Sequence, residues 1–188
     1  MAIDSDMNEG LKSAAAFVIL ILSGFSAPRC DATIHDSDGS AASVQALHNA
    51  ARDGDTITIP AGTFTWLTGI TITKGITLRG QTTITGAGTA TPTTNDLTII
   101  KDDSPRSGQG AKIVNVGCGP NQSFRLTGIT FTYGTITTYP SSDGCIRLHS
   151  SNSSSNTTMR VDNCHFNSLY QGKIFWLAGW VYGLQIIM

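Results

Sequence analysis

Charged residues are scarce in this sequence. Asp, Glu, Lys and Arg make up 13% of the 188 residues, and 12 basic residues against 13 acidic ones give a formal net charge of −1. A nucleic-acid-binding surface needs clustered Lys and Arg, so the composition argues against a nucleic-acid partner. It also argues against binding of a polyanion through bulk charge.

Long helical patterns are equally scarce, and none occurs after residue 53. One short helix is predicted before that point, with Ser43 as its N-cap and Gly54 as its stop. Apolar residues between Val44 and Ala51 recur at spacings of three and four, as on one face of a helix. The remainder of the chain must therefore build its core from β-strands.

Short strands rich in Ile and Thr follow the predicted helix. Polar and apolar residues alternate over 56–59, 70–73 and 76–79, and Pro and Gly separate these runs. Strands this short can bury one face only by stacking on copies of themselves, which predicts a solenoid. Residues 87–96, which are rich in Gly, Pro and Thr, are predicted to form a loop between two coils.

An internal repeat agrees with this prediction. Segment 124–131 aligns with segment 159–166, 35 residues later, and both read apolar, Arg, apolar, polar, Gly or Asn, apolar, polar, Phe. An apolar residue followed two positions later by Gly also occurs at 78–80 and at 181–183. Gly and Asn tolerate a left-handed backbone, so the repeat predicts one sharp corner in each coil.

Residues 44–64 and 75–80 resemble the N-terminal cap and first two coils of the pectate-lyase-like family, and the resemblance extends over roughly residues 40–183. It implies an all-β, right-handed parallel β-helix with a short N-terminal capping helix. It also implies action on polysaccharides. Lyases of this family use calcium held by carboxylates and an Arg or Lys base, whereas hydrolases of the fold use clustered Asp residues.

Residues 1–32 have the features of a signal peptide. Lys12 precedes an apolar run over residues 14–22, and small residues at 30–32 favour cleavage after Ala32. We therefore expect a secreted or cell-surface protein with a domain over residues 33–188 and no membrane segment after cleavage. The alternative is an N-terminal membrane anchor, for which the run is shorter than the roughly 20 residues that span a bilayer.

Cysteine is the other scarce residue type, with four in the chain. Removal of the leader takes one of them and leaves Cys118, Cys145 and Cys164, none of which has zinc-ligand spacing. Cys164 aligns with Ile129 in the repeat, which predicts an inward-facing core residue. A disulfide between Cys145 and Cys164 in adjacent coils is the alternative.

Candidate catalytic residues are few, because the acidic residues are scattered over different coils. The candidates are Arg147, His149, Asp162 and His165. If Ile146 and Leu148 face inward, alternation places Arg147 and His149 outward. Arg160, Asp162 and His165 should also face outward, one coil later, where stacking could bring Asp162 near Arg147 or His149. Such a group could bind or deprotonate an acidic sugar, and the alternative is a set of solvated surface residues.

The final residues, 180–188, read as a strand without a polar capping segment, so we expect a β-helix truncated at its C-terminus that lacks part of its active site. The leading hypothesis is an exported lyase or glycoside hydrolase that acts on an acidic polysaccharide, with calcium as a possible cofactor by family resemblance. The alternative is a non-catalytic carbohydrate-binding surface module, such as an adhesin or a tailspike-like segment.

Overall fold

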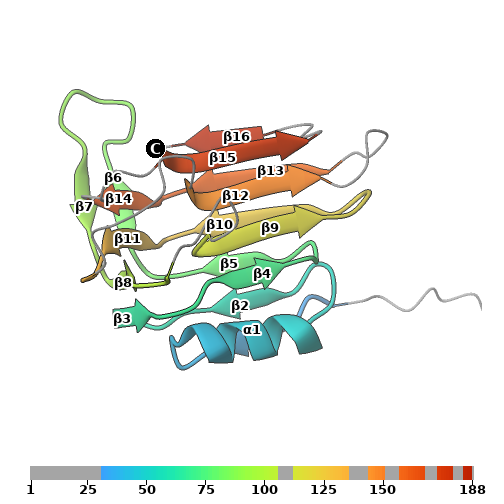
Figure 1. The fold of residues 1–188 in the computed structure, drawn as a ribbon. Helices are drawn as coiled ribbons and strands as arrows, with labels where there is room; N and C mark the ends of the chain where they lie inside the picture. Colours follow the sequence, from blue (N-terminus) through green and yellow to red (C-terminus); the bar gives the residue numbers. More distant parts are fainter. Residues whose placement is uncertain are drawn as a thin grey trace, which may run out of the picture. The chain divides into compact units, whose positions relative to one another are not determined.

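The computed structural model describes residues 31–105, 112–135, 144–150, 157–167, 173–179 and 184–187 (Figure 1). The chain divides into one unit at Met1–Asp31 and another at Ala32–Met188, and the fold below is that of the second unit. The predicted signal peptide, with its alternative as a membrane anchor, lies outside the described residues apart from its last two positions. No helix in the described part of the chain has the length and apolar character needed to cross a membrane.

The described unit is mostly β, with parallel sheets and one short helix. Sheet A contains β1 (Ile34–Asp36), β2 (Thr56–Thr58), β5 (Thr77–Arg79), β10 (Ser123–Thr127), β13 (Thr158–Asp162) and β16 (Leu184–Ile187). Sheet B contains β3 (Gly62–Trp66), β8 (Thr98–Asp102), β11 (Thr130–Tyr133) and β14 (His165–Asn167). Sheet C contains β4 (Ile70–Ile72), β9 (Val114–Cys118), β12 (Gly144–Ser150) and β15 (Lys173–Gly179).

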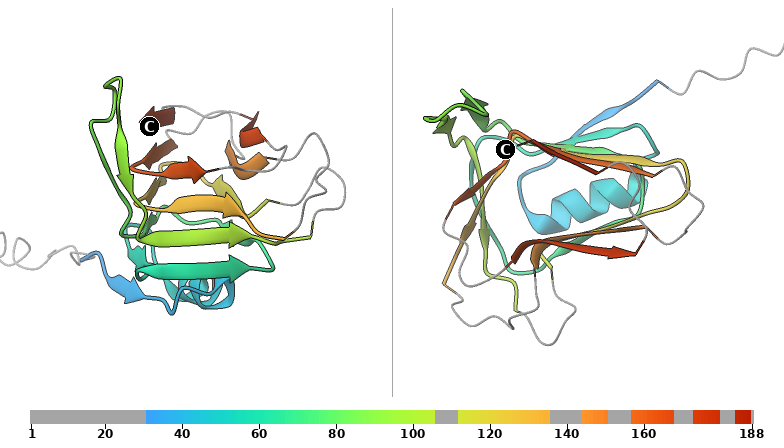
Figure 2. Two further views of the ribbon diagram at one scale, coloured as in Figure 1. Left: turned by 90° about the vertical axis from the view of Figure 1, so that its left-hand side faces the viewer. Right: turned by 90° about the horizontal axis from the view of Figure 1, so that it is seen from above.

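The chain visits the three parallel sheets in a fixed order. It runs through β2, β3 and β4, which belong to sheets A, B and C, and then repeats this order with β5, β8 and β9, with β10, β11 and β12, and with β13, β14 and β15. Each circuit therefore adds one strand to each sheet. Seen from above, the strands of the three sheets flank a common interior (Figure 2).

Strand register confirms the internal repeat. Phe124 pairs with Met159 and Phe131 pairs with Phe166, which reproduces the offset of 35 residues. The corner residues Gly128 and Asn163 have φ angles of 72° and 50°, as the left-handed corner requires. The backbone N–H of Gly128 donates to the carbonyl oxygen of Asn163 (3.1 Å), so the two corners stack.

The same register corrects one part of the repeat. Leu78 pairs with Leu126, as the pattern at 78–80 predicts. The pattern at 181–183 is wrong as a repeat, because Val161 pairs with Ile186 and not with Val181. Residues 181–183 themselves lie outside the described part of the chain. A two-residue similarity is too short to determine the register of a strand.

The helix begins earlier than the sequence predicts. Helix α1 spans Ala41–Ala50, and its N-cap is Ser40, whose Oγ accepts a hydrogen bond from the backbone N–H of Ser43 (3.1 Å). The prediction of Ser43 as the N-cap is therefore wrong by three residues, since two serines with the same capping chemistry are close together. Gly54, with a φ of 93°, lies in the turn after the helix. The helix packs against β4 and β2 at one end of the stacked strands (Figure 1).

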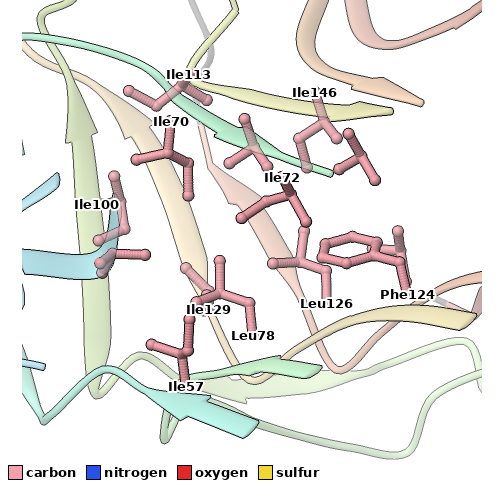
Figure 3. Packing of buried hydrophobic residues seen from close by; sticks show 14 of the residues in the cluster. Ile57, Ile70, Ile72, Leu78, Ile100, Ile113, Phe124, Leu126, Ile129 and Ile146 are labelled. Atoms are coloured by element: carbon pink, nitrogen blue, oxygen red, sulfur yellow. The ribbon is translucent and has the colours of Figure 1, made fainter. Parts of the chain in front are cut away.

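The core is formed by inward-facing residues that stack from strand to strand. Figure 3 shows side chains from the three sheets meeting in one interior. The stacked positions include Ile57, Leu78 and Leu126 in sheet A, Ile100 and Phe131 in sheet B, and Ile70, Val114 and Ile146 in sheet C, all at most 1% exposed. Alternation of Ile with Thr thus marks the buried face correctly.

The cysteines belong to this core. Cys118, Cys145 and Cys164 are buried thiols. The prediction that Cys164 is a core residue is confirmed, and the alternative of a Cys145–Cys164 disulfide is wrong. Burial raises the pKa of the Cys164 thiol to about 12, which makes it a poor nucleophile.

The predicted loop at 87–96 is wrong in part. Strand β6 (Thr83–Thr85) pairs antiparallel with β7 (Thr93–Asn95), and the two form a hairpin between β5 and β8. The hairpin projects from the corner between sheets A and B (Figure 2). Its strands are largely exposed: β6 reads Thr-Ile-Thr with Ile84 half-buried, and β7 reads Thr-Thr-Asn, without the apolar residues by which a strand with one buried face is recognised.

Candidate functional site

The four candidate residues lie in three different sheets. Arg147 and His149 lie in β12 of sheet C, Asp162 lies in β13 of sheet A, and His165 lies in β14 of sheet B. Ile146 and Leu148 are buried, whereas Arg147 and His149 are half-buried, so the predicted alternation in β12 is confirmed. The structure does not bring Asp162 to Arg147 or His149, because β12 and β13, although consecutive in the chain, belong to different sheets.

Asp162 instead forms an ion-pair cluster within sheet A. Arg125 donates from Nε to Oδ1 (2.9 Å) and from Nη2 to Oδ2 (2.7 Å) of Asp162. Arg160 Nε lies 3.1 Å from Oδ1. The hydroxyl of Thr127 and the side-chain amide of Asn163 donate to Oδ2, each at 3.2 Å.

This carboxylate is buried beneath its partners. The Asp162 side chain is 3% exposed, whereas those of Arg125 and Arg160 are 43% and 45% exposed. Hydrogen bonds from Arg125, together with the charges of both arginines, hold the pKa of Asp162 below its ordinary value, although burial acts in the opposite direction. The same pairing raises the pKa of Arg125. The result is a fixed anion that orients two half-exposed guanidinium groups.

Strand register explains why these side chains meet. Arg125 pairs with Arg160 and Thr127 pairs with Asp162, on adjacent strands of sheet A. Arg79 lies one strand further along, opposite Thr127. Two hollows of about 360 and 480 Å³ adjoin on this outer face and share Arg125 in their linings. We call the surface formed by Arg79, Arg125, Arg160 and Asp162 the arginine face.

Sequence analysis did not identify Arg79 or Arg125 as site residues. The signal was present in the repeat, which places Arg125 opposite Arg160. It was not sufficient, because the sequence does not show that Asp162, two residues after Arg160, points between the two arginines.

His165 has a different partner, contributed by the segment after the hairpin. Its Nδ1 lies 2.9 and 3.0 Å from the two carboxylate oxygens of Asp96. The hydroxyl of Thr130 donates to Asp96 Oδ1 (2.7 Å). The two side chains are similarly accessible, with 29% of His165 and 26% of Asp96 exposed. They form a His–Asp pair that the 69-residue separation hides in the sequence.

His149 is less suited to anion binding than the arginines of the arginine face. Its ring lies against Gly117, where an added Cβ would be 2.6 Å from the imidazole. Burial, and secondarily the charge of Arg147, lowers the pKa of His149. The neutral imidazole is therefore favoured at neutral pH.

The described residues do not fit a calcium ion. Calcium takes six to eight oxygen ligands, with carboxylates among them. Among the residues that the structure describes, no group of three or more His, Cys, Asp or Glu is placed to hold a metal. The scattered carboxylates have other partners: Asp96 binds His165, Asp102 binds Ser104, Asp103 binds Thr135 and Asp162 binds Arg125. Asp143 lies outside the described residues.

We expect Asp162 to make folding stability pH-dependent. Its pKa is lower in the folded protein than in the unfolded chain, so its contribution is present above about pH 4 and is lost as the pH falls through the folded value. Asp162→Asn should lower the free energy of unfolding by about 1–3 kcal/mol at pH 7, and the difference from wild type should shrink below pH 4. Urea denaturation at pH 3, 5 and 7 measures it. A difference that is equal at pH 7 and pH 3 would contradict the assignment.

No family model, curated protein or solved structure matches this chain. Membership of the pectate-lyase-like family therefore stays a prediction from the quoted residues.

Proposed function

We propose that the described unit is a right-handed parallel β-helix of the pectate-lyase-like type, from a protein that is exported to the medium or the cell surface. Two observations support this architecture: the fixed order of visits to three parallel sheets, and the position of α1 at one end of the strands. Parallel crossover connections are right-handed in about 98% of cases, which supports the handedness.

The ligand in this proposal is an acidic polysaccharide, bound on the arginine face. The observation that carries it is the pair of half-exposed guanidinium groups of Arg125 and Arg160 on adjacent strands, backed by the buried Asp162. Arg125 uses Nε and Nη2 for Asp162, so its Nη1 remains for a ligand. Arg recognises carboxylates well because its planar group offers several fixed donors.

The overall composition argues against binding of a polyanion through bulk charge, whereas the proposed ligand is acidic. The local charge of the arginine face resolves this conflict. The chain has a net charge of −1, yet the arginine face combines three arginines with one aspartate. Adjacent strands lie about 4.8 Å apart, so a uronate chain that crosses the strands would meet successive guanidinium groups. Binding would thus depend on local geometry and not on bulk charge.

The reaction in this proposal is that of a lyase or a glycoside hydrolase. An arginine paired with a uronate carboxylate would neutralise it and make the neighbouring carbon-bound proton easier to remove. The second candidate is a non-catalytic binding module. It is favoured by one observation: both oxygens of Asp162 are engaged by Arg125, which leaves this carboxylate poorly placed to act as a base.

Binding to polygalacturonate, with uncharged dextran as the comparison polymer, tests the ligand. We expect wild-type protein to bind polygalacturonate alone, with an affinity that falls as salt is added. Arg125→Gln and Arg160→Gln should each weaken binding about 10-fold or more, because a charge-assisted hydrogen bond is worth about 1.5–3 kcal/mol. Arg52→Gln, an exposed residue after α1, is the matched control and should bind as wild type.

Two outcomes decide between the alternatives. Equal binding to dextran and polygalacturonate, or unchanged binding by both arginine variants, would overturn the proposed ligand. If the ligand is correct, product analysis of the full chain separates the mechanisms: an ultraviolet-absorbing unsaturated sugar indicates a lyase, new reducing ends without it indicate a hydrolase, and neither indicates a binding module.

A further inference from the structure

A cavity of about 340 Å³ lies beside the His165–Asp96 pair, on the sheet B side of the hairpin. Its lining includes Ile84, Pro92, Thr94, His165, Phe166 and Ile174. The volume lies at the lower end of the roughly 300–1,000 Å³ that is usual for small-molecule sites. Because most of these lining residues are apolar, the cavity is mainly apolar, with one imidazole among its lining groups.

The contact with Asp96 determines which imidazole nitrogen carries the proton. A carboxylate only accepts hydrogen bonds, and both Asp96 oxygens lie within 3.0 Å of Nδ1, so Nδ1 is the donor. In the neutral imidazole, Nε2 is then an acceptor. Within the described part of the chain, no hydrogen bond engages Nε2, and 29% of the side chain is exposed.

Asp96 is itself fixed by a hydroxyl network. Thr130 donates to Asp96 Oδ1, so its hydroxyl oxygen accepts from the hydroxyl of Thr82, 3.1 Å away. Thr82 and Thr130 are buried. The imidazole is therefore held in one tautomer and one orientation before any ligand arrives.

The apolar part of the lining favours a flat ring. Phe166 is fixed by a stack on Phe131, with centroids 5.5 Å apart and planes at 8°, and by an edge contact with Phe175, with centroids 5.2 Å apart. Pro92 and Ile84 come from the hairpin and line the same cavity. Contacts between aromatic rings contribute more binding free energy than the buried area alone would give. Cys164 also lines the cavity, and its single S–H is directed to the backbone, with Sγ 3.4 Å from the carbonyl oxygen of Asp162 and 3.8 Å from that of Leu126.

We propose that this cavity is a second ligand site, which takes one hydroxylated aromatic ring whose hydroxyl donates to His165 Nε2. Asp96 is a positioning residue that maintains Nε2 as the acceptor. The cavity contains none of the four residues of the arginine face, although Ile84 lines both this cavity and the hollow of about 360 Å³ on that face. The site does not depend on the proposed polysaccharide.

The test compares phenol with toluene, which lacks the hydroxyl, and with cyclohexanol, which lacks the aromatic ring. Nitrogen-15 NMR of the imidazole and saturation binding to the full chain are the two measurements. We expect wild-type protein to bind phenol about 2- to 10-fold more tightly than toluene, the range expected for one net hydrogen bond, and also more tightly than cyclohexanol. Phenol, but not toluene, should shift the Nε2 resonance of His165.

Two variants and one control separate binding from structural effects. His165→Phe should remove the preference for phenol over toluene, whereas His149→Phe, the control in sheet C, should retain it. Asp96→Asn should move the imidazole proton toward Nε2, which the NMR signature reports, and reduce the preference. Equal binding of phenol and toluene by wild type, an unshifted Nε2 resonance, or a preference retained by His165→Phe would overturn the proposal. The wild-type NMR measurement decides even if a variant does not fold.

Discussion

Replacing Phe131 with Ala should lower the free energy of unfolding by about 3–5 kcal/mol. The Phe131 side chain is 0% exposed, stacks on Phe166, and lies between Ile100 and Phe166 in sheet B. Its removal would leave a cavity that the neighbouring strands β8 and β14 cannot close, because their backbones are held by parallel strand pairing. Urea denaturation followed by far-ultraviolet circular dichroism measures the loss.

A surface leucine supplies the comparison for this prediction. Leu67 is 64% exposed, so Leu67→Ala should change the free energy of unfolding by no more than about 0.5 kcal/mol. If Phe131→Ala and Leu67→Ala lower the free energy of unfolding by the same amount, the stacked positions of sheet B do not form the continuous core described above.

Gly128→Ala should destabilise the protein by about 2–5 kcal/mol, through two separate costs. Gly128 has a φ of 72°, where a residue with a Cβ loses about 1–2 kcal/mol. In addition, an added Cβ would lie 2.7 Å from the carbonyl oxygen of Gly80 in the coil below, and relief of that contact costs about 1–3 kcal/mol. Thermal and urea denaturation both measure the change.

Gly54→Ala separates the two costs. Gly54 also has a positive φ, of 93°, but an added Cβ would meet no atom within 4 Å. Gly54→Ala should therefore lower the free energy of unfolding by the backbone cost alone, about 1–2 kcal/mol. A Gly128→Ala variant no less stable than Gly54→Ala would show that the stacked corners are not in close contact.

The repeating elements were predictable because their signals are local. Alternation of Ile and Thr identified β2, β4 and β5 within one or two residues, since a strand with one buried face has a period of two. The repeat at 124–131 and 159–166 predicted the register of β10 with β13 and of β11 with β14. The hairpin was missed because β7, which reads Thr-Thr-Asn, carries no such alternation and lies in a stretch rich in Gly, Pro and Thr.

The candidate site was only partly predictable. Asp162 and His165 were recognised as outward-facing polar residues, but their partners Arg125 and Asp96 lie 37 and 69 residues away in the chain. Those contacts depend on how many residues each circuit uses between sheets, which composition and spacing do not reveal. Arg147 and His149 were grouped with Asp162 because stacking of adjacent coils could have brought them together, although they belong to sheet C and Asp162 belongs to sheet A.

Short parallel strands with a repeated left-handed corner could be derived from the sequence, because side-chain alternation and the tolerance of Gly and Asn for positive φ are properties of neighbouring residues. Which polar residues meet depends on the tertiary structure. Arg125 and Arg160 converge on Asp162 only because β10 and β13 pair in one register, and Asp96 reaches His165 only because the chain after the hairpin returns to the corner of sheet B. Ion pairs form between groups that are close in space, and the path of the intervening chain sets that distance.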